Sequence, residues 1–252
     1  MYWILASDVD GTLTGDREAL DHLAARLQRL RDDGNLFLIF STGRNLSQVI
    51  SGVAHEGLPE PDAVICQVGT EIYLPPYQEE SHPLEEWRRR LIAQYRREEA
   101  LSFLEGIEGL LLQPPEYNTE LKTSCYLDRC NEPERAAAEI IRRVEPLSDR
   151  YQVVWSSGRD LDILPASSGK GKAIEFLIEF RDMRADQVIV AGDSGNDATM
   201  FQHFRRGVVV SNAQPELLQI AKEMDKETVY LASTPHACGV EEGLENYGVF
   251  AL

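Results

Sequence analysis

Two aspartates stand directly after the first apolar run of the chain. Residues 2–6 read as a buried strand, and Asp8 and Asp10 follow it, together with Gly11 and Thr12. Side chains alternate along a strand, so we expect both carboxylates on one face. Gly11 permits a sharp turn, and Thr12 adds a hydroxyl and a backbone N–H. Neighbouring carboxylates repel unless a cation lies between them, so the pair predicts a Mg²⁺ site. A solvated acidic turn is the alternative.

A second acidic cluster occupies residues 192–197, between an apolar run at 188–191 and a predicted helix. Asp193 therefore stands at the carboxyl end of a strand, where ligands bind in open α/β sheets. Asp197 lies in the first turn of the helix, where the helix dipole favours negative charge. A capped helix with an acidic first turn is the alternative.

Two short segments offer groups that could bind an anion. Thr42 and Gly43 follow the apolar run 36–40 and place a hydroxyl and a backbone N–H at another strand end. Lys170 lies between two glycines, in a predicted loop before a helix that begins at Lys172. The alternatives are an ordinary turn for the first segment and a solvated basic loop for the second.

The apolar runs that position these residues alternate with helical patterns. We expect strands at 2–6, 36–40, 63–66, 188–191, 207–210 and 229–231, with a hairpin-like extension at 68–73. Continuous apolar strands separated by helices are typical of a parallel sheet covered by helices on both faces. The predicted fold class is therefore α/β, with a doubly wound, mostly parallel sheet.

The pattern changes after Pro75 and Pro76. The elements expected next are a charged helix at 87–103, a half-exposed strand at 121–127, a helix at 136–144 and a hairpin at 151–164 that turns at Ser157 and Gly158. This order predicts an antiparallel sheet with two helices on one side. The simplest division is a core of residues 1–78 and 165–252, interrupted by an inserted α+β cap domain of residues 79–164.

The composition limits the partners of the chain. Its 252 residues carry a formal net charge of −17, which argues against nucleic acid or an anionic membrane surface as a partner. Its apolar runs are too short to span a bilayer, and the first residues lack the basic region of a signal peptide. The 4 cysteines have no metal-binding spacing and predict reduced thiols in a cytoplasmic protein.

The order of these features along the chain adds information. An acid pair, a hydroxyl residue, a lysine and a second acidic cluster resemble, in that order, the motifs of the haloacid dehalogenase superfamily of phosphohydrolases. The stretches 40–44, 68–72, 160–165, 192–197 and 210–214 are similar to plant and cyanobacterial sucrose-phosphate phosphatases. Lys122 and Ser124 stand where those enzymes have a Lys-X-Ser strand. The chain departs from several of them at Gly11, where they have a larger residue, and Arg159 occupies a position that varies among them.

The resemblance implies Mg²⁺-dependent hydrolysis through an aspartyl-phosphate. Asp8 would be the nucleophile, and Asp10 the general acid and base. Mg²⁺ would be held by Asp8, the Asp10 carbonyl and Asp193, with Asp197 holding either a ligand of the metal or Lys170. The phosphate-binding residues that it implies are Thr42, Gly43, Lys170 and Asn196.

The resemblance also implies a sugar phosphate as the substrate, and we expect sucrose 6-phosphate. The implied sugar contacts are Glu71, Lys122, Ser124, Ser157, Gly158 and Arg159. The connections near 75–76 and 165–169 are the expected hinges of the cap.

Alternatives are a phosphatase for mannosylfructose phosphate, glucosylglycerol phosphate or a glycosyl-phosphoglycerate, a non-catalytic sugar-phosphate-binding module, and a phosphomutase. The intact acids favour an enzyme, and the cap offers little basic charge for the second phosphate of a mutase substrate. Association with a sucrose-phosphate synthase follows only from pathway order.

Overall fold

The computed structural model describes residues 2–224 and 228–251, and its larger sheet, sheet A, carries the first strand of the chain. The strands of sheet A are β1 (Trp3–Ser7), β2 (Leu36–Ser41), β3 (Ala63–Cys66), β4 (Glu71–Tyr73), β9 (Val188–Gly192), β10 (Gly207–Val209) and β11 (Val229–Leu231). Their order is β11-β10-β9-β1-β2-β3-β4. All neighbouring pairs are parallel except β3 and β4, so the mostly parallel sheet is confirmed.

Alternation along β1 divides the core around sheet A into two layers. Trp3 and Leu5 point to one face and Ile4 and Ala6 to the other, and all of them are buried. The first face is covered by α1 (Arg17–Asp32), α2 (Leu46–His55) and α9 (His236–Asn246). The second face is covered by α6 (Lys170–Phe180), α7 (Ala198–His203) and α8 (Pro215–Glu223). Sheet A is therefore doubly wound, as the sequence predicted.

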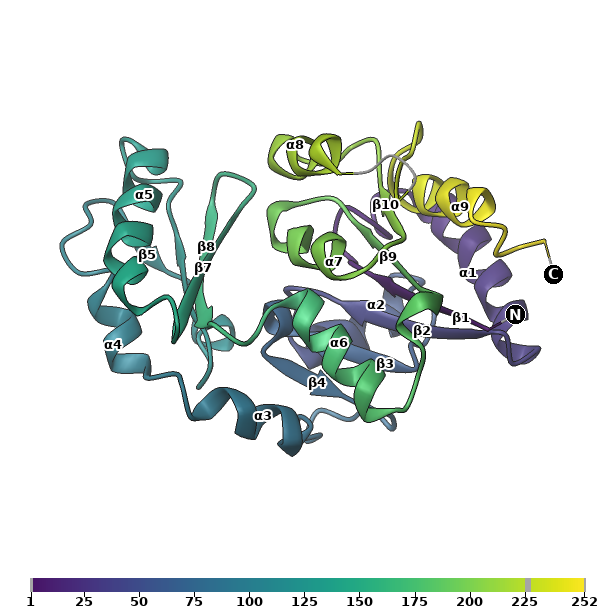
Figure 1. Cartoon of the computed structure of the whole chain (residues 1–252), viewed down its shortest axis with the longest axis horizontal. Coiled ribbons are helices and arrows are strands. Elements are labelled where there is room, and N and C mark those ends of the chain that lie inside the picture. The colour runs from purple at the N-terminus through teal and green to yellow at the C-terminus, as the bar shows by residue number, and fades with distance from the viewer. Residues whose placement is uncertain (1, 225–227, 252) are drawn as a thin grey trace.

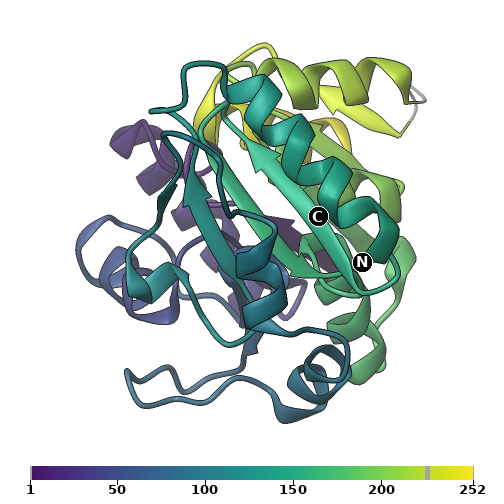
Figure 2. The same ribbon diagram turned by 90° about the vertical axis from the view of Figure 1, so that its left-hand side faces the viewer.

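Sheet B forms a separate lobe, on the left in Figure 1. Its antiparallel strands are β5 (Leu111–Leu112), β6 (Thr123–Tyr126), β7 (Tyr151–Ser156) and β8 (Asp160–Pro165), in the order β5-β6-β8-β7. The helices α4 (Arg97–Ser102) and α5 (Pro133–Val144) lie on its outer face, toward the viewer in Figure 2. The α3 helix (Glu85–Ile92) lies below, beside β4. The inserted α+β fold is confirmed, while the limits 79 and 164 stay a prediction.

The single helix expected at 87–103 is wrong, because the chain forms α3 and α4 with an irregular segment between them. Tyr95 in that segment explains the break. Its ring is buried, and its hydroxyl lies 2.7 Å from Thr123 Oγ1 and 3.2 Å from the carbonyl oxygen of Ile163. These contacts with sheet B outweigh the helix propensity of the charged residues around Tyr95.

The half-exposed strand expected at 121–127 is also wrong, because both faces of β6 are largely covered. Cys125 points into the hydrophobic core of the lobe. On the other face, Lys122 and Ser124 are buried as well, and the Ser124 hydroxyl donates to Asp162 on β8. The alternation of apolar and polar residues along this strand therefore separates two buried faces, of which one is apolar and the other polar.

Two glycines bring the chain close to itself on either side of the insertion. Gly69 precedes β4 with φ +92°, and Gly169 precedes α6 with φ +109°. A Cβ atom on Gly69 would lie 2.3 Å from the carbonyl carbon of Gly169 and 2.6 Å from the backbone nitrogen of Lys170. The segments that flank the insertion therefore touch at a point where only glycine fits.

Two expectations from the composition can be compared with the structure. Every helix in residues 2–224 and 228–251 is too short or too polar to cross a membrane. All four cysteines are free thiols, as predicted, and Cys66, Cys125 and Cys130 are buried.

Candidate active site

The carboxyl ends of neighbouring strands meet at one edge of sheet A. The central strand β1 lies between β9 and β2, and Asp8, Asp193 and Thr42 directly follow these strands. The backbone N–H of Asp8 donates to the carbonyl of Ala191 at 2.9 Å, which ties the two acidic loops together. The structure thus gathers the residues that the sequence placed at strand ends.

Lys170 is fully buried among these acids. Its Nζ donates to Asp8 Oδ1 and to Asp197 Oδ1, each at 2.6 Å. The sequence placed Lys170 in a loop before a helix from Lys172, but α6 already begins at Lys170. A solvated basic loop is therefore wrong for this residue, because the helix start directs the side chain into the interior.

The acids outnumber the one lysine that they surround. Burial alone lowers the pKa of Lys170, but the carboxylates of Asp197 and Asp8 outweigh it and raise that pKa above its usual range. Burial raises the pKa of Asp8. The charge of Lys170 lowers that pKa only in part, because the nearby carboxylates of Asp197 and Asp193 raise it again. Burial and the charge of Asp197 raise the pKa of Asp193 to about 6. The cluster therefore favours a further cation.

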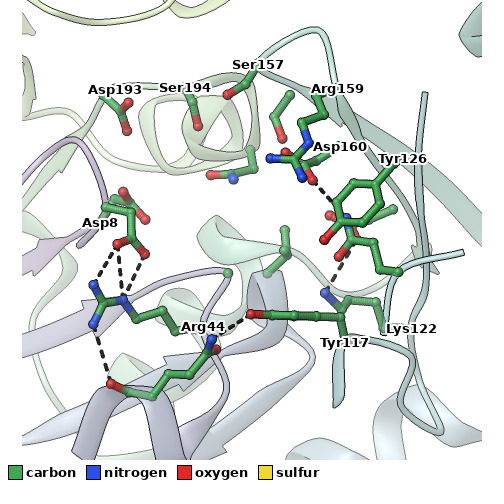
Figure 3. Close-up of a pocket in the computed structure, with 18 of the residues that line it drawn as sticks. Asp8, Arg44, Tyr117, Lys122, Tyr126, Ser157, Arg159, Asp160, Asp193 and Ser194 are labelled. Carbon is green, nitrogen blue, oxygen red and sulfur yellow. Dashed lines mark hydrogen bonds and ion pairs between the residues drawn. The ribbon is translucent and has the colours of Figure 1, made fainter. Parts of the chain in front are cut away.

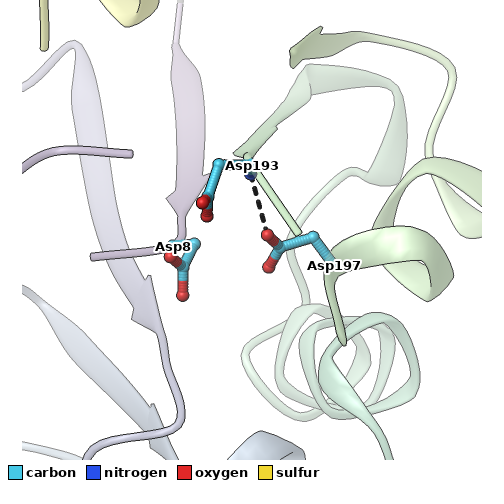
Figure 4. A group of neighbouring side chains, drawn as sticks. All are labelled: Asp8, Asp193 and Asp197. Carbon is cyan, nitrogen blue, oxygen red and sulfur yellow. Dashed lines mark hydrogen bonds between the residues drawn. The ribbon is translucent and has the colours of Figure 1, made fainter. Parts of the chain in front are cut away.

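One carboxylate oxygen from each of Asp8, Asp193 and Asp197 lies within 4.8 Å of the other two. Figure 4 shows the three side chains close together. A donor set of carboxylates suits a hard cation such as Mg²⁺. Asp197 is already engaged, because its Oδ1 binds Lys170 and its Oδ2 accepts the backbone N–H groups of Asp193 and Ser194. Asp8 and Asp193 are thus the better direct ligands, which fits the outer role expected of Asp197.

Asp10 differs from Asp8 in its surroundings. Since β1 ends at Ser7, the alternation that was expected to align the two acids does not extend to Asp10, although both line the same cleft. The exposed Asp10 carboxylate accepts from Arg44 at 2.7 and 2.9 Å, and Arg44 also donates to Glu56 at 2.7 Å. The dashed lines at Arg44 in Figure 3 mark these bonds. Sequence reasoning missed Arg44, although it directly follows Gly43.

The other predicted phosphate ligands differ in exposure. Thr42 is fully buried, and its Oγ1 accepts the backbone N–H of Arg44 at 3.1 Å, whereas Gly43 lines the cleft. Asn196 also lines the cleft, and its buried Oδ1 finds no hydrogen-bond partner within the described residues. An unsatisfied buried acceptor is costly, so Asn196 Oδ1 is suited to a donor from a ligand or a bound water.

A cleft of about 560 Å³ separates the acids from sheet B. Figure 3 shows its two walls, with Asp8, Arg44, Asp193 and Ser194 on the sheet A side, and Tyr117, Lys122, Tyr126, Ser157, Arg159 and Asp160 across from them. Of the predicted sugar contacts, Lys122, Ser157 and Arg159 therefore line the cleft.

The remaining predicted sugar contacts lie elsewhere. Ser124 is fully buried behind the cleft, where its hydroxyl reaches Asp162. Gly158 occupies the turn between β7 and β8, as the sequence predicted, with φ +62°. Glu71 lines a separate small recess near Arg88, and accepts from the Tyr73 hydroxyl at 2.9 Å.

The sheet B wall contains two acids that sequence reasoning did not select. Asp162 is almost fully buried and lies 3.5 Å from Lys122 Nζ. Asp160 accepts from Gln113 Nε2 at 2.9 Å, and burial raises its pKa. Both belong to the stretch 160–165, where alternation puts them on one face of a strand, so this signal was available in the sequence.

Hydrogen bonds join the two walls at opposite ends of the cleft. They run from Gln48 Nε2 to the Tyr117 hydroxyl at 2.6 Å, from Gln67 Nε2 to the Glu116 carbonyl at 2.8 Å, and from the Ser157 N–H to Glu216 Oε1 at 3.0 Å. The structure therefore shows sheet B in contact with the core across the site.

The chain matches the family described as sucrose-6F-phosphate phosphohydrolase over residues 1–248. It belongs to that family. It is 31% identical to the mannosylfructose-phosphate phosphatase of Agrobacterium fabrum, over 98% of this chain and 97% of the relative. It is 28% identical to sucrose-phosphatase 1 of Nicotiana tabacum, over 98% of this chain but only 59% of that protein. A crystal structure of the sucrose-phosphatase of Synechocystis sp. PCC6803, in complex with sucrose and phosphate, superposes with a TM-score of 0.90 and 34% identity over 98% of each chain.

This sucrose-6F-phosphate phosphohydrolase family member is a phosphoric monoester hydrolase. The relatives confirm the resemblance found in the sequence and the expectation of an enzyme. The structure agrees, because Asp8, Lys170, Asp193 and Asp197 form one connected cluster. A binding module would have no use for a buried acid held by a lysine at the end of an open cleft.

Proposed function

We propose that this chain hydrolyses a phosphorylated disaccharide, with sucrose 6-phosphate as the preferred substrate, in a Mg²⁺-dependent reaction. The cleft carries this proposal, because it joins the Asp8 cluster directly to polar side chains of sheet B. The Synechocystis relative, which was crystallised with sucrose and phosphate, supports the choice of sugar. A disaccharide phosphate would place its phosphate at the acids and its sugar rings between the two walls.

The metal would be held by the carboxylates of Asp8 and Asp193 and by the backbone carbonyl of Asp10. When bound, Mg²⁺ reduces the repulsion between an attacking carboxylate and the phosphoryl oxygens. Lys170 supplies a further positive charge at 2.6 Å from Asp8 Oδ1. Gly43 and Asn196 line the cleft, where they can bind phosphoryl oxygens, and the fully buried Thr42 precedes Gly43 in the chain.

In the first half-reaction, an Asp8 oxygen would attack phosphorus as the bond from phosphorus to the sugar oxygen breaks. The leaving oxygen takes a proton from Asp10, so the products are an aspartyl-phosphate on Asp8 and the free sugar. In this structure the Asp10 carboxyl group accepts from Arg44. Asp10 must therefore leave Arg44 before it can reach the leaving oxygen.

In the second half-reaction, Asp10 would remove a proton from a water molecule, whose oxygen attacks the phosphorus of the aspartyl-phosphate. The bond from phosphorus to the Asp8 oxygen breaks, which releases phosphate and restores the carboxylate. Lys170 and Asp197 keep the position of Asp8 fixed throughout, because both lie in the fully buried part of the cluster.

Residues 79–164 would act as a cap that opens for exchange and closes for reaction, with hinges near 75–76 and 165–169. The hydrogen bonds across the cleft support closure in the present structure. Lys122, Ser157 and Arg159 would contact the sugar, with Ser124 and Gly158 supporting them from β6 and the hairpin turn. Glu71 stays a predicted contact that would require the sugar to reach the neighbouring recess.

A phosphatase for mannosylfructose phosphate is the second candidate, because the Agrobacterium fabrum relative is 31% identical over nearly its whole length. Phosphate release should be measured with and without Mg²⁺ over sucrose 6-phosphate, mannosylfructose phosphate, glucosylglycerol phosphate, a glycosyl-phosphoglycerate and simple hexose phosphates. We expect metal-dependent turnover with the highest kcat/KM for sucrose 6-phosphate. A higher kcat/KM for another glycosyl phosphate would show that sucrose 6-phosphate is not the preferred substrate, while the proposed metal-dependent hydrolysis would stand.

Two further predictions go with this function. The four free thiols support a cytoplasmic location, where thiols stay reduced. Association with a sucrose-phosphate synthase would place the substrate beside the cleft, and co-purification of the two proteins would test it.

A further inference from the structure

Two side chains from distant parts of the chain converge on one carbonyl in the loop after β1. Asn212 Nδ2 donates to the carbonyl oxygen of Gly11 at 2.8 Å, and His236 Nδ1 lies 3.0 Å from the same oxygen. Because a carbonyl only accepts, Nδ1 of His236 carries the hydrogen in this arrangement. The backbone N–H of His236 also donates to Asn212 Oδ1 at 2.9 Å. We call Asn212 and His236 the Gly11 clamp.

The geometry of the clamp is enforced from several sides. Asn212 can face Gly11 only with its nitrogen, because its oxygen accepts from the His236 backbone. His236 has φ +51°, a conformation that residues other than glycine rarely adopt. Its ring covers Gly15, where a Cβ atom would lie 2.4 Å from His236 Cε1. Backbone strain of this kind persists where the surroundings impose it, and it concentrates at functional sites.

Gly11 lies between Asp10, the proposed general acid, and the loop that carries Asp193. Gly11 links Asp10 to Thr12, and its φ is +80°. A Cβ atom on Gly11 would lie 2.5 Å from Asp193 Oδ2, and Thr12 Oγ1 donates to Asp193 Oδ1 at 3.2 Å. Gly11 is therefore in close contact with the Asp193 carboxylate while the clamp holds its carbonyl. A larger residue at Gly11 would need the loop or Asp193 to move.

We propose that Asn212 and His236 are positioning residues for the hydrolysis. By fixing the carbonyl of the Gly11–Thr12 peptide, they set where Asp10 and the backbone N–H of Thr12 stand relative to the phosphoryl group, whereas the Gly11 N–H donates to Thr14 Oγ1 at 3.4 Å. This role rests on the proposed function of Asp10. The described lining of the cleft comprises other residues, so the clamp acts through the loop and not on the substrate. Its loss should lower kcat and leave KM nearly unchanged.

The test compares variants that break single parts of the clamp. Asn212→Asp keeps the acceptor for the His236 N–H and loses the donor to Gly11. His236→Gly removes the ring and relieves the left-handed backbone, whereas His236→Asn keeps an amide and tolerates that backbone. His82→Gly is the matched control, since His82 is exposed in a loop of the insertion. Rates are measured with Mg²⁺ and p-nitrophenyl phosphate, a substrate that does not depend on the sugar assignment.

We expect kcat to fall by about 10- to 100-fold in Asn212→Asp and His236→Gly, with KM within about twofold, because small misplacements of reacting groups cost rates of this size. His236→Asn should lie between His236→Gly and the unmodified chain, and His82→Gly should match the unmodified chain. Hydrogen exchange of residues 9–14, measured without metal or substrate, should be faster in Asn212→Asp and in His236→Gly than in the unmodified chain.

A kcat within about twofold of the unmodified chain in both variants would overturn the clamp, as would a loss of rate that follows the unfolded fraction in thermal unfolding. Unchanged exchange at residues 9–14 would overturn it as well, even if the unmodified chain hydrolysed nothing. Failure to hydrolyse sucrose 6-phosphate would instead refute the proposed substrate, because neither readout of the clamp uses that sugar.

Discussion

The two walls of the cleft are built differently. On the sheet A side, Lys170 and Asp197 are fully buried, Asp8 is nearly so, and each is bonded to another member of the cluster. On the sheet B side, Arg159 is about half exposed, with its guanidinium over the ring of Tyr126 at 4.4 Å. The cluster of Lys170, Asp8 and Asp197 in the first wall is fixed before a substrate arrives, as phosphoryl transfer requires. The second wall keeps side chains that can adapt to a sugar. Substitutions on the first wall should therefore affect rate and stability, and those on the second should affect affinity.

The largest expected effect comes from Asp8→Asn, which removes the proposed nucleophile. Turnover should fall by about 10⁴-fold or more, as it does when a residue that forms the covalent intermediate is lost. The fold should remain, since Lys170 keeps Asp197 as a partner. Phosphate release and circular dichroism measure the two effects, and Asp21→Asn on the exposed face of α1 is the control. Retention of most of the activity would show that the covalent route is wrong.

Lys170→Met tests whether the sheet A wall is held by its one lysine. The substitution leaves Asp8 and Asp197 buried without a counter-charge, so we expect a loss of about 3–5 kcal/mol in the free energy of unfolding. Turnover should also fall sharply. Lys172→Met, which loses only a hydrogen bond to the Ala166 carbonyl, should cost about 1 kcal/mol. Urea denaturation of both variants compares them, and equal losses would contradict the assigned role of Lys170.

The dependence of stability on pH and Mg²⁺ tests the charge of the same wall. The pKa of Asp193 is about 6 in the folded chain against an ordinary value of 3.8, so the folded state binds its proton more tightly. The contribution of Asp193 to the stability of the metal-free chain is thus present at low pH and is lost as pH rises through about 6.

Mg²⁺ should reverse this loss, because it would bind the ionised acids at the proposed site. At a concentration about 100 times its Kd, it would add about 2.7 kcal/mol at pH 7.5 and much less at pH 5. Thermal unfolding at both pH values measures the difference. Asp193→Asn should remove the response to Mg²⁺, and a variant that kept the full response would show that the metal binds elsewhere.

The smallest effect is expected on the sheet B wall. Arg159→Ala should raise KM for the sugar phosphate by roughly five- to tenfold, the equivalent of one typical hydrogen bond of about 1 kcal/mol, with little change in kcat. Arg135→Ala, on the outer helix α5, is the matched control. Steady-state kinetics would separate the two parameters. A fall in kcat without a change in KM would contradict the proposal that the sheet B wall determines affinity and the sheet A wall determines rate.

The sequence predicted the sheet A wall better than the sheet B wall, for a physical reason. Strand ends in a parallel sheet have fixed places, so short motifs sufficed to bring Asp8, Thr42 and Asp193 together. The burial of Lys170 could not be predicted, because it depends on where α6 begins. Arg44 was missed because its role depends on Asp10 and Glu56, which are distant in sequence.

In the insertion, contacts between distant segments outweigh local patterns. Tyr95 interrupts a helix that the charge pattern favours, because its hydroxyl reaches sheet B. Lys122 and Ser124 look like the solvent face of a strand, yet Asp162 gives them a buried polar partner. Only the pairing of β6 with β8 brings these residues together, and no single stretch of sequence contains that pairing.

The crossing of Gly69 and Gly169 has a consequence for protein engineering. Since the chain touches itself there, just before β4 and just before α6, the two connections to the insertion leave the core close together, and β4 stays in sheet A when only the insertion is replaced. The Lys170 cluster lies entirely on the core side of this crossing. We therefore expect that residues 79–164 can be replaced by the corresponding segment of a relative, and that such a graft transfers sugar preference while the Lys170 cluster stays in place.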